Sequence, residues 1–500
     1  MTSYLLAIDQ GTTSSRAMIF DDQGQVKAVS QKEFTQYFPQ DGWVEHDAME
    51  IIQSVFETVT EALAALPAGS VPTAVGITNQ RETTVIWDRK TGLPIHPAIV
   101  WQDRRTAEIC RKMKEAGRKD NIEDSINEKT GLLLDPYFSA TKISWILDNL
   151  PGARQRAEQG DLAFGTIDSF ILWHLTKGRV HKTDVTNASR TLLFNIRDMA
   201  WDKALLALFN VPEALLPEVR PCDDHFGHID DSLFGQRLPI TAMAGDQQAA
   251  LIGQNCLSPG QIKCTFGTGG FMMMNSGDKI IRSKNRLLTT VAYQIGDKVA
   301  YGLEGSFFCA GSAVQWLRDG LKIIQSAEET EALANSITSS GGVYMVPAFT
   351  GLGAPHWNPD TRGTLFGLTR ATGVAEIARA TLESVGFQAA DLLTAMIQDS
   401  QLPCETLKVD GGMVQNGWLL QFLADIMQLE IIRPKIPETT AFGIAMLAGV
   451  SAGQFASIND MSILYKYNDA RKASRHENEV SQQKEKWENA VKSTCYYSEK

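Results

Sequence analysis

The chain has 500 residues, more than one hydrophobic core usually serves, which predicts two large domains. Its 43% hydrophobic and 21% charged residues are typical of a globular protein, and its net charge of -11 argues against nucleic acid as the main partner, because a phosphate backbone selects basic surfaces. The first residues lack a basic n-region and a long apolar h-region, and no apolar run approaches the ~20 residues that span a bilayer, so we predict a cytoplasmic protein. The 7 cysteines are dispersed without a Cys-x-x-Cys spacing, which predicts reduced, mostly buried thiols and neither a disulfide framework nor a zinc site.

The start of the chain predicts a β-hairpin whose turn suits a phosphate group. Apolar residues 4–8 and 17–20 flank a turn rich in glycine, threonine and serine, so several backbone N–H groups and hydroxyls point at one small volume. Asp9, at the end of the first strand, would repel phosphate unless a cation lay between them, and Mg²⁺ is the usual one. Taken alone, this motif is better explained by an ordinary polar turn, because Gly-Thr-Thr turns are common.

Polar residues recur where the next predicted strands end. An amphipathic helix is expected over residues 47–66, and a buried strand over 73–78 leads to Arg81 and Glu82. Two more strands are expected over 83–87 and 98–101. In α/β sheets, ligands bind in the crevice outside the carboxyl ends of the strands. Arg81 and Glu82 are therefore either a surface ion pair or the donors and acceptor for a pair of vicinal hydroxyls.

Residues 105–220 are predicted to be mostly helical, with helices over 106–116, 141–149 and 169–176. A strand over 239–244 then ends just before Asp246, which begins an alanine-rich helix. Asp is a common helix N-cap, but it is also a suitable general base for the hydroxyl that attacks a phosphoryl group. We place the domain boundary after this helix, which gives domains 1–254 and 255–500.

The second half repeats the opening pattern, because strands over 261–265 and 271–274 flank the turn Phe-Gly-Thr-Gly-Gly at 266–270. A second hairpin facing phosphate is the simplest explanation. A third glycine turn at 410–412 follows a short strand and would let a flat adenine ring approach the backbone. Further strands are expected over 290–294, 298–303 and 407–409, helices over 312–321, 374–399, 416–427 and 439–449, and a charged surface helix and tail over about the last 40 residues. The chain contains neither a P-loop nor a Rossmann fingerprint.

Three aromatic residues have two interpretations. Trp101, Tyr137 and Phe271 are by default part of the hydrophobic core. In a polyol pocket they would instead pack against C–H faces while polar neighbours bind the hydroxyls.

Several long motifs, taken together, resemble the FGGY family of carbohydrate kinases. They lie at 9–16, 80–83, 135–142 and 245–250 in the first half and at 267–269, 353–357, 362–370, 410–412 and 438–440 in the second half. Within that family the chain resembles the members that phosphorylate glycerol, because the Gln-Arg-Glu-Thr segment at 80–83 separates them from xylulose and ribulose kinases.

The resemblance implies an α/β fold of the actin/hexokinase type (ribonuclease H-like), with two duplicated α/β lobes around a cleft. It implies transfer of the γ-phosphoryl group of ATP to a terminal hydroxyl of glycerol with Mg²⁺, and a homodimer or homotetramer. Asp246 would be the general base and Asp9 the carboxylate nearest the metal. The implied nucleotide contacts are Thr12, Thr13, Ser14 and Arg16 in the first half and Thr268, Gly311, Gln315, Gly412 and Asn416 in the second. The implied glycerol contacts are Arg81, Glu82, Trp101, Tyr137, Asp246, Gln247 and Phe271.

Two alternatives stay open. A kinase for another polyol or ketose, such as erythritol or xylulose, would share the phosphate motifs and differ in its pocket. A non-catalytic ATPase of the actin type would use nucleotide to move the lobes and bind a protein, but it gives Arg81, Glu82 and Asp246 no role. Phe266 and Gly270 also stand where many members of the family have Tyr and Cys, which predicts changed packing beside the pocket with the phosphate turn intact.

Overall fold

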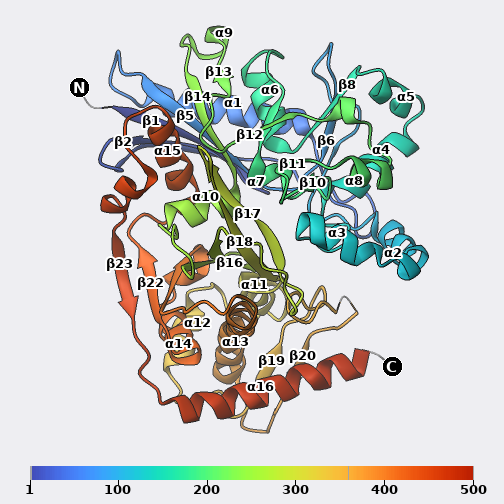
Figure 1. The fold of residues 1–500 in the computed structure, drawn as a ribbon. Coiled ribbons are helices and arrows are strands. Elements are labelled where there is room, and N and C mark those ends of the chain that lie inside the picture. The colour runs from blue at the N-terminus through green and yellow to red at the C-terminus, as the bar shows by residue number, and fades with distance from the viewer. Residues whose placement is uncertain (1–2, 359, 499–500) are drawn as a thin grey trace.

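The first lobe is built on a six-stranded sheet in the order β13-β14-β5-β1-β2-β3. The protein is described by a computed structural model, which covers residues 3–358 and 360–498 (Figure 1). β1 runs parallel to β5, and β5 runs parallel to β14, whereas β2, β3 and β13 pair in antiparallel fashion. The strands are β1 (Tyr4–Gln10), β2 (Ser14–Asp21), β3 (Val26–Glu33), β5 (Pro72–Asn79), β13 (Gly227–His228) and β14 (Pro239–Gly245).

The second lobe is built on a seven-stranded sheet in the order β17-β18-β16-β15-β21-β22-β23. Here β15, β21 and β22 are the parallel strands, as β1, β5 and β14 are in the first sheet, and each sheet ends in an antiparallel edge strand. The strands are β15 (Ile262–Phe266), β16 (Gly270–Gly277), β17 (Leu288–Ile295), β18 (Lys298–Phe307), β21 (Thr406–Asp410), β22 (Glu430–Pro434) and β23 (Tyr467–Arg471). The two predicted hairpins are therefore confirmed, and they occupy equivalent positions in two related sheets.

The helix predicted over 47–66 is α1 (Ala48–Ala64), and local chemistry explains where it begins. The Asp47 carboxylate accepts hydrogen bonds from the backbone N–H groups of Met49 and Glu50, which satisfies two amides that a helix start leaves unpaired. Ile51, Ile52, Val55 and Val59 recur at helical spacing and are buried in the core of the first lobe.

The region 105–220 contains the three predicted helices, together with short strands that the helical prediction omitted. The helices are α2 (Ala107–Ala116), α3 (Ile122–Thr130), α4 (Ser139–Asn149), α5 (Ala153–Glu158), α6 (Ile167–Leu175), α7 (Val185–Ala188) and α8 (Lys203–Leu208), followed later by α9 (Asp231–Phe234) and α10 (Asp246–Gly253). The short strands of this region are β8 (Leu162–Gly165), β9 (Lys182–Asp184), β10 (Phe194–Asn195), β11 (Ala200–Trp201) and β12 (Glu218–Arg220). Three others precede it: β4 (Glu45–His46), β6 (Val85–Asp88) and β7 (Ala98–Ile99). The strand expected over 98–101 is thus shorter, and its carboxyl end delivers Trp101.

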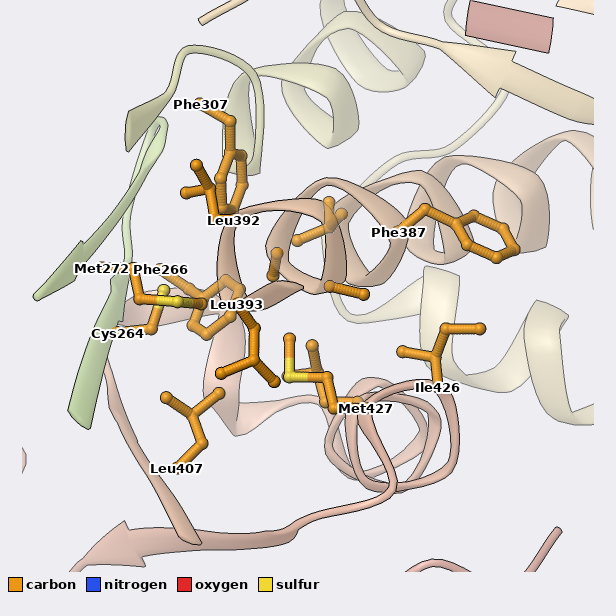
Figure 2. Packing of buried hydrophobic residues seen from close by; sticks show 14 of the residues in the cluster. Cys264, Phe266, Met272, Phe307, Phe387, Leu392, Leu393, Leu407, Ile426 and Met427 are labelled. Atoms are coloured by element: carbon orange, nitrogen blue, oxygen red, sulfur yellow. The ribbon is translucent and has the colours of Figure 1, made fainter. Parts of the chain in front are cut away.

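The core of the second lobe lies between its sheet and the long helix α13 (Val374–Ser400). Figure 2 shows Leu392 of α13 beside Phe307 and Leu393 near Phe266 and Met272 of the sheet, with Met427 of α14 (Gly417–Met427) beside Leu393. The helix expected over 312–321 is α11 (Gly311–Gln315) continued by a π-helical turn (Trp316–Gly320), and α12 (Glu329–Asn335) follows. β19 (Tyr344–Val346) and β20 (Thr364–Phe366) pair in antiparallel fashion as a separate two-stranded sheet.

Helix α15 (Thr439–Ser451) comes from the second half of the chain but packs on the first sheet. Figure 1 shows it beside β1 and β2, and its Ile444 shares a hydrophobic cluster with Leu5, Ala7 and Ala74. A Cβ on Gly76 of β5 would lie 2.5 Å from the backbone oxygen of Ile444, so only glycine permits this approach. The two halves of the sequence are therefore interlocked at this helix.

The prediction of a surface helix and tail at the C-terminus was incomplete. Residues 467–471 add strand β23 to the second sheet, and α16 (Glu477–Ser498) is anchored by Trp487, which is 2% exposed. The Trp487 ring stacks on Phe387 of α13 at 5.2 Å, and its Nε1 donates to Asp391 at 2.8 Å.

All 7 cysteines are free, and five of them are buried, as predicted. Within the described part of the chain, no helix combines the length and the apolar character that crossing a bilayer requires.

Candidate active site

The two hairpin turns are joined by contacts through one tryptophan. In the first turn the Gly11 N–H donates to the Ser14 carbonyl at 2.9 Å, and in the second the Gly267 N–H donates to the Gly269 carbonyl at 2.9 Å. Trp101 donates from Nε1 to Thr12 Oγ1 at 2.9 Å, and its ring meets Phe271 edge to face at 5.9 Å. Because Phe271 follows the second turn directly, Trp101 bridges the two turns.

The predicted nucleotide residues of the second half gather around the second turn. The Gly311 N–H donates to the Gly267 carbonyl at 2.9 Å, and the Thr268 carbonyl accepts from Ala310 and Ser312, so the start of α11 is fixed to the hairpin. Thr268 is exposed there, and Gln315 is exposed on α11.

The third glycine turn follows β21 as predicted. Gly411 has φ 93°, and a Cβ on it would lie 2.4 Å from the Phe266 carbonyl oxygen, so this position requires glycine. A Cβ on Gly412 would meet nothing within 4 Å, which means that open space lies beside it. Asn416 caps α14, because its Oδ1 accepts from the Leu419 N–H at 3.0 Å.

Arg16 connects the first hairpin to the second half of the chain. Its guanidinium forms an ion pair with Glu438, which immediately precedes α15, and it also donates to Gln31 Oε1 at 2.9 Å. Thr13 is exposed at the tip of the first turn, and Ser14 Oγ accepts a hydrogen bond from Gln31. A polyphosphate arriving at this turn would therefore meet hydroxyls and one guanidinium.

Three of the predicted glycerol contacts form an aromatic cluster. Trp101 meets Tyr137 edge to face at 5.6 Å on one side and Phe271 on the other. Tyr137 also contacts Phe138 at 5.0 Å. The aromatic residues thus come from three separate segments of the chain and pack against one another.

The predicted base and the predicted hydroxyl ligand are in direct contact. Arg81 follows β5 and Asp246 follows the neighbouring β14, and Arg81 Nε lies 3.1 Å from Asp246 Oδ1. The Asp246 side chain is 30% exposed, whereas that of Arg81 is 2% exposed. Asp246 is not the helix N-cap that was one of its two interpretations, because Gly245 holds that position and Asp246 is the first helical residue. Its Oδ1 accepts from the Gln247 N–H at 2.6 Å.

Two charged residues that the sequence analysis did not single out complete this cluster. Glu304 of β18 binds Arg81 at 2.5 and 3.0 Å and Arg190 at 2.8 Å. Arg190 also donates from Nε to Glu82 Oε1 at 2.6 Å. Burial raises the pKa of Glu304, but Arg190 and Arg81 outweigh burial and hold this pKa at about 2. Burial raises the pKa of Glu82, and Arg190 and Arg81 only partly oppose that effect.

A third residue that the sequence analysis omitted, Lys263 of β15, binds Gln247. Its buried ammonium donates to Gln247 Oε1 and to Thr265 Oγ1, the latter at 3.0 Å. Burial lowers the pKa of Lys263, while the charge of Asp410 opposes this. A signal was present for both Lys263 and Glu304, because each is a charged residue in the interior of a mostly apolar strand, which is rare without a partner.

Asp9 lies close enough to Asp246 for the charges of the two carboxylates to interact. Burial raises the pKa of Asp9 to about 6, Arg16 opposes this shift, and the charge of Asp246 adds to it. Among residues 3–358 and 360–498, no group of three or more His, Cys, Asp or Glu side chains is placed to hold a metal ion. Two surface hollows of ≈ 760 and ≈ 470 Å³ are lined by other residues than those predicted for the site.

Gly270 explains the changed packing expected beside the second turn. A Cβ on Gly270 would lie 2.0 Å from Cζ of Phe307, so the Phe307 ring fills the space that a larger side chain would occupy. Phe266 lies near the same ring, at 6.1 Å between centroids.

Comparison with known proteins gives matches over almost the whole chain. Residues 4–253 match the N-terminal domain and residues 262–452 the C-terminal domain of the FGGY family of carbohydrate kinases. The chain is 58% identical over 460 residues to a glycerol kinase of Ectopseudomonas mendocina, with 92% of each chain covered. It is 56% identical to glycerol kinase 1 of Pseudomonas aeruginosa, with 98% of this chain and 99% of that protein covered.

Solved structures confirm the predicted fold. The crystal structure of Plasmodium falciparum glycerol kinase with ADP matches with a TM-score of 0.92 and 35% identity, covering 99% of this chain and 98% of that one. A gluconate kinase of Lactobacillus acidophilus matches with a TM-score of 0.89 at 20% identity, covering 100% of this chain and 99% of the other, which bears on the fold alone. The two duplicated α/β lobes are thus those of the actin/hexokinase type. With both domain models matched in order and relatives above 50% identity over nearly the full length, the chain belongs to the FGGY family of carbohydrate kinases.

Proposed function

We propose that this protein is a kinase that transfers the γ-phosphoryl group of ATP to a terminal hydroxyl of glycerol. The observation that carries the proposal is the 3.1 Å contact between Arg81 Nε and Asp246 Oδ1, at the carboxyl ends of two adjacent parallel strands. The identity of 58% and 56% to two glycerol kinases supports the same substrate.

In this mechanism Asp246 is the general base. Arg81 and the Gln247 N–H both bind Oδ1, which leaves Oδ2 to accept the proton of the attacking hydroxyl. Arg81 and Glu82 bind the other hydroxyls, with Gln247 beside them, and the aromatic rings of Trp101, Tyr137 and Phe271 pack against the C–H groups of glycerol. Closure of the cleft would exclude water, so that glycerol and not water attacks the γ-phosphorus in line.

The residues around the turns have the chemistry that Mg²⁺-ATP requires. Thr12, Thr13, Ser14 and Arg16 would bind the phosphates from one side and Thr268 from the other, with Gly311, Gln315, Gly412 and Asn416 around the nucleoside. The open space beside Gly412 suits a flat adenine ring. The half-buried Asp9 carboxylate, with its raised pKa, would be stabilised in its ionised form by a cation. Mg²⁺ commonly takes one or two carboxylates together with substrate phosphates, and it would neutralise charge on the transferred group.

A coupled ADP-release assay tests the substrate. Purified protein with Mg²⁺-ATP should turn over with glycerol faster than with dihydroxyacetone, erythritol or xylulose. A preference for erythritol or xylulose would leave the family intact and replace the substrate, whereas stimulation by none of the four would refute the kinase function.

The base is tested by Asp246→Asn, with Arg81→Ala as a comparison. We expect Asp246→Asn to lower kcat by roughly 10²- to 10⁴-fold with little change in nucleotide affinity, because a general base contributes about that much. Arg81→Ala should mainly raise the KM for glycerol. Near-normal turnover of Asp246→Asn would remove Asp246 from the role of base, and an unchanged KM in Arg81→Ala would place that residue outside the pocket.

The domain limits 1–254 and 255–500, the cytoplasmic location and the homodimer or homotetramer stay predictions. Light scattering of the purified protein would measure its oligomeric state, and cell fractionation its location.

A further inference from the structure

One carboxylate from the second lobe lies among the proposed glycerol ligands of the first lobe. Glu304 lies on β18, next to β16, which begins at the second hairpin turn. It binds Nη1 and Nη2 of Arg81 at 2.5 and 3.0 Å and Nη2 of Arg190 at 2.8 Å. The side chains of Glu304 and Arg81 are each 2% exposed, and that of Arg190 is 0% exposed. The carboxylate therefore has two guanidinium partners and is shielded from bulk solvent.

Each arginine that binds Glu304 also binds one residue of the proposed site. Arg81 uses the edge of its guanidinium that remains, Nε, to bind Asp246 at 3.1 Å. Arg190 uses its Nε to bind Glu82 at 2.6 Å. A guanidinium is planar and its N–H directions are fixed. A carboxylate that binds one edge of the group therefore sets the direction in which the N–H groups of the other edge point. The position of Glu304 thus fixes the orientation of Arg81, Asp246 and Glu82 together.

The charge balance of the cluster supports the same role for Glu304. Arg81 and Arg190 carry two positive charges, while Glu82, Glu304 and Asp246 offer three carboxylates. Without Glu304 the two arginines would have only Glu82 and Asp246 as carboxylate partners, and those are the groups that the proposed reaction needs for hydroxyl binding and proton transfer. The low pKa of Glu304, about 2, keeps it ionised at the pH where a kinase works.

We propose that Glu304 is a positioning residue for polyol binding, and that it acts through Arg81 and Arg190 without touching the substrate. This inference rests on the proposed function, because it needs glycerol as the ligand of Arg81 and Glu82. A residue on a strand of the second lobe would thus align side chains of the first lobe that bind glycerol.

The experiment compares Glu304→Gln with a matched control, Glu383→Gln. Glu383 of α13 is also a buried carboxylate paired with an arginine, at 3.0 Å from Arg379 Nε, and its side chain is 5% exposed. Glu304→Gln should raise the KM for glycerol by roughly ten- to a hundredfold, the range for losing a charge-assisted hydrogen bond, with the KM for ATP changed by less than about twofold. Glu383→Gln should leave both KM values unchanged at a comparable loss of thermal stability.

A second variant keeps the test decisive where Glu304→Gln does not fold. Arg190→Lys keeps the positive charge but loses the planar guanidinium that binds Glu304 and Glu82 at the same time. It should therefore also raise the KM for glycerol and leave the KM for ATP unchanged. The proposal would be overturned if a folded Glu304→Gln had a normal KM for glycerol, or if its KM values for glycerol and ATP rose equally. It would also be overturned if neither Glu304→Gln nor Arg190→Lys folded, because the ion pair between Glu304 and Arg190 would then serve stability. Turnover of the wild type with glycerol separates these outcomes from failure of the proposed function, in which the wild type itself would be inactive.

Discussion

Replacing Gly253 by Ala tests the contact between two helices that join the lobes. Gly253 is the last residue of α10, and a Cβ there would lie 1.9 Å from the Thr439 carbonyl oxygen at the start of α15. The approach is reciprocal, because a Cβ on Gly443 of α15 would lie 2.0 Å from the Ala249 carbonyl oxygen of α10. Ordinary contact begins at 3.4 Å, so a methyl group at either position must push the helices apart.

Two effects of opposite sign compete in Gly253→Ala. Alanine favours the helix over glycine by up to about 1 kcal/mol. Overpacking of a tight contact costs about 1–3 kcal/mol, and here the obstacle is backbone, which cannot rotate away as a side chain can. We therefore expect a net loss of roughly 1–2 kcal/mol. Because α10 begins with Asp246, the same displacement should lower kcat.

Urea unfolding and steady-state kinetics with glycerol and Mg²⁺-ATP measure both expected changes. Gly160→Ala is the control, since Gly160 lies in a turn with φ +80° where a Cβ meets nothing within 4 Å. That variant should lose only about 1 kcal/mol, from its left-handed backbone, and keep a normal kcat. If Gly253→Ala were as stable as the wild type or more so, and fully active, the close contact of α10 with α15 would be refuted.

Two further predictions concern Asp9 and Trp487. Because burial raises the pKa of Asp9 to about 6 while the ionised form is the one that binds Mg²⁺, affinity for Mg²⁺-ADP should fall as the pH drops through 6, by up to about tenfold per unit. Calorimetry from pH 8 to pH 5 should show a steeper fall for the wild type than for Asp9→Asn, whose remaining pH dependence is that of the nucleotide; equal slopes would contradict the prediction. Trp487→Ala should cost about 3–5 kcal/mol of stability, and Trp487→Phe only about 1 kcal/mol, because the phenyl ring still stacks on Phe387 and only the hydrogen bond to Asp391 is lost. Denaturant unfolding measures both, and a Trp487→Ala variant of normal stability would show that α16 is not anchored there.

The parts of the fold that the sequence predicted are those with local causes. The strands of both hairpins are continuous apolar runs interrupted by a glycine-rich turn, and α1 combines an Asp47 cap with a regular apolar stripe. The strand over 98–101 was too long because pairing ends after Ile99, where the Trp101 N–H turns to donate to Thr83 Oγ1 at 3.2 Å. That hydrogen bond is a tertiary contact, which no periodicity predicts.

The C-terminal helix was misjudged for a different reason. Val480, Trp487 and Val491 recur at helical spacing and are buried, so a stripe was present in the sequence. The charged residues of the opposite face dominate the composition and conceal it. For this helix, periodicity was a better guide than average polarity.

Within the site, the residues found from motifs are those that follow a strand end, such as Arg81 and Asp246. Glu304 and Arg190 lie elsewhere, and their partners are distant in the chain: Arg81 and Glu304 are 223 positions apart. A charged residue inside a buried strand indicates that a partner of opposite charge exists, but the sequence does not identify that partner. Only the folded structure supplies that pairing.

The position of Asp246 depends on both lobes, because α10 is held at both ends by strands of the second sheet. At its start Gln247 accepts from Lys263 of β15, and at its end Gln254 Nε2 donates to Asp410 of β21 at 2.8 Å. Lys408 of β21 adds hydrogen bonds of 2.8 Å to the carbonyls of Gln254 and Asn255, where a cation also complements the helix dipole. The same two strands end in the turns proposed to hold the phosphates and the adenine. A shift of those turns relative to the first sheet must therefore move α10, the helix that carries Asp246. The close backbone contact between α10 and α15 prevents the two helices from approaching further to compensate for that shift.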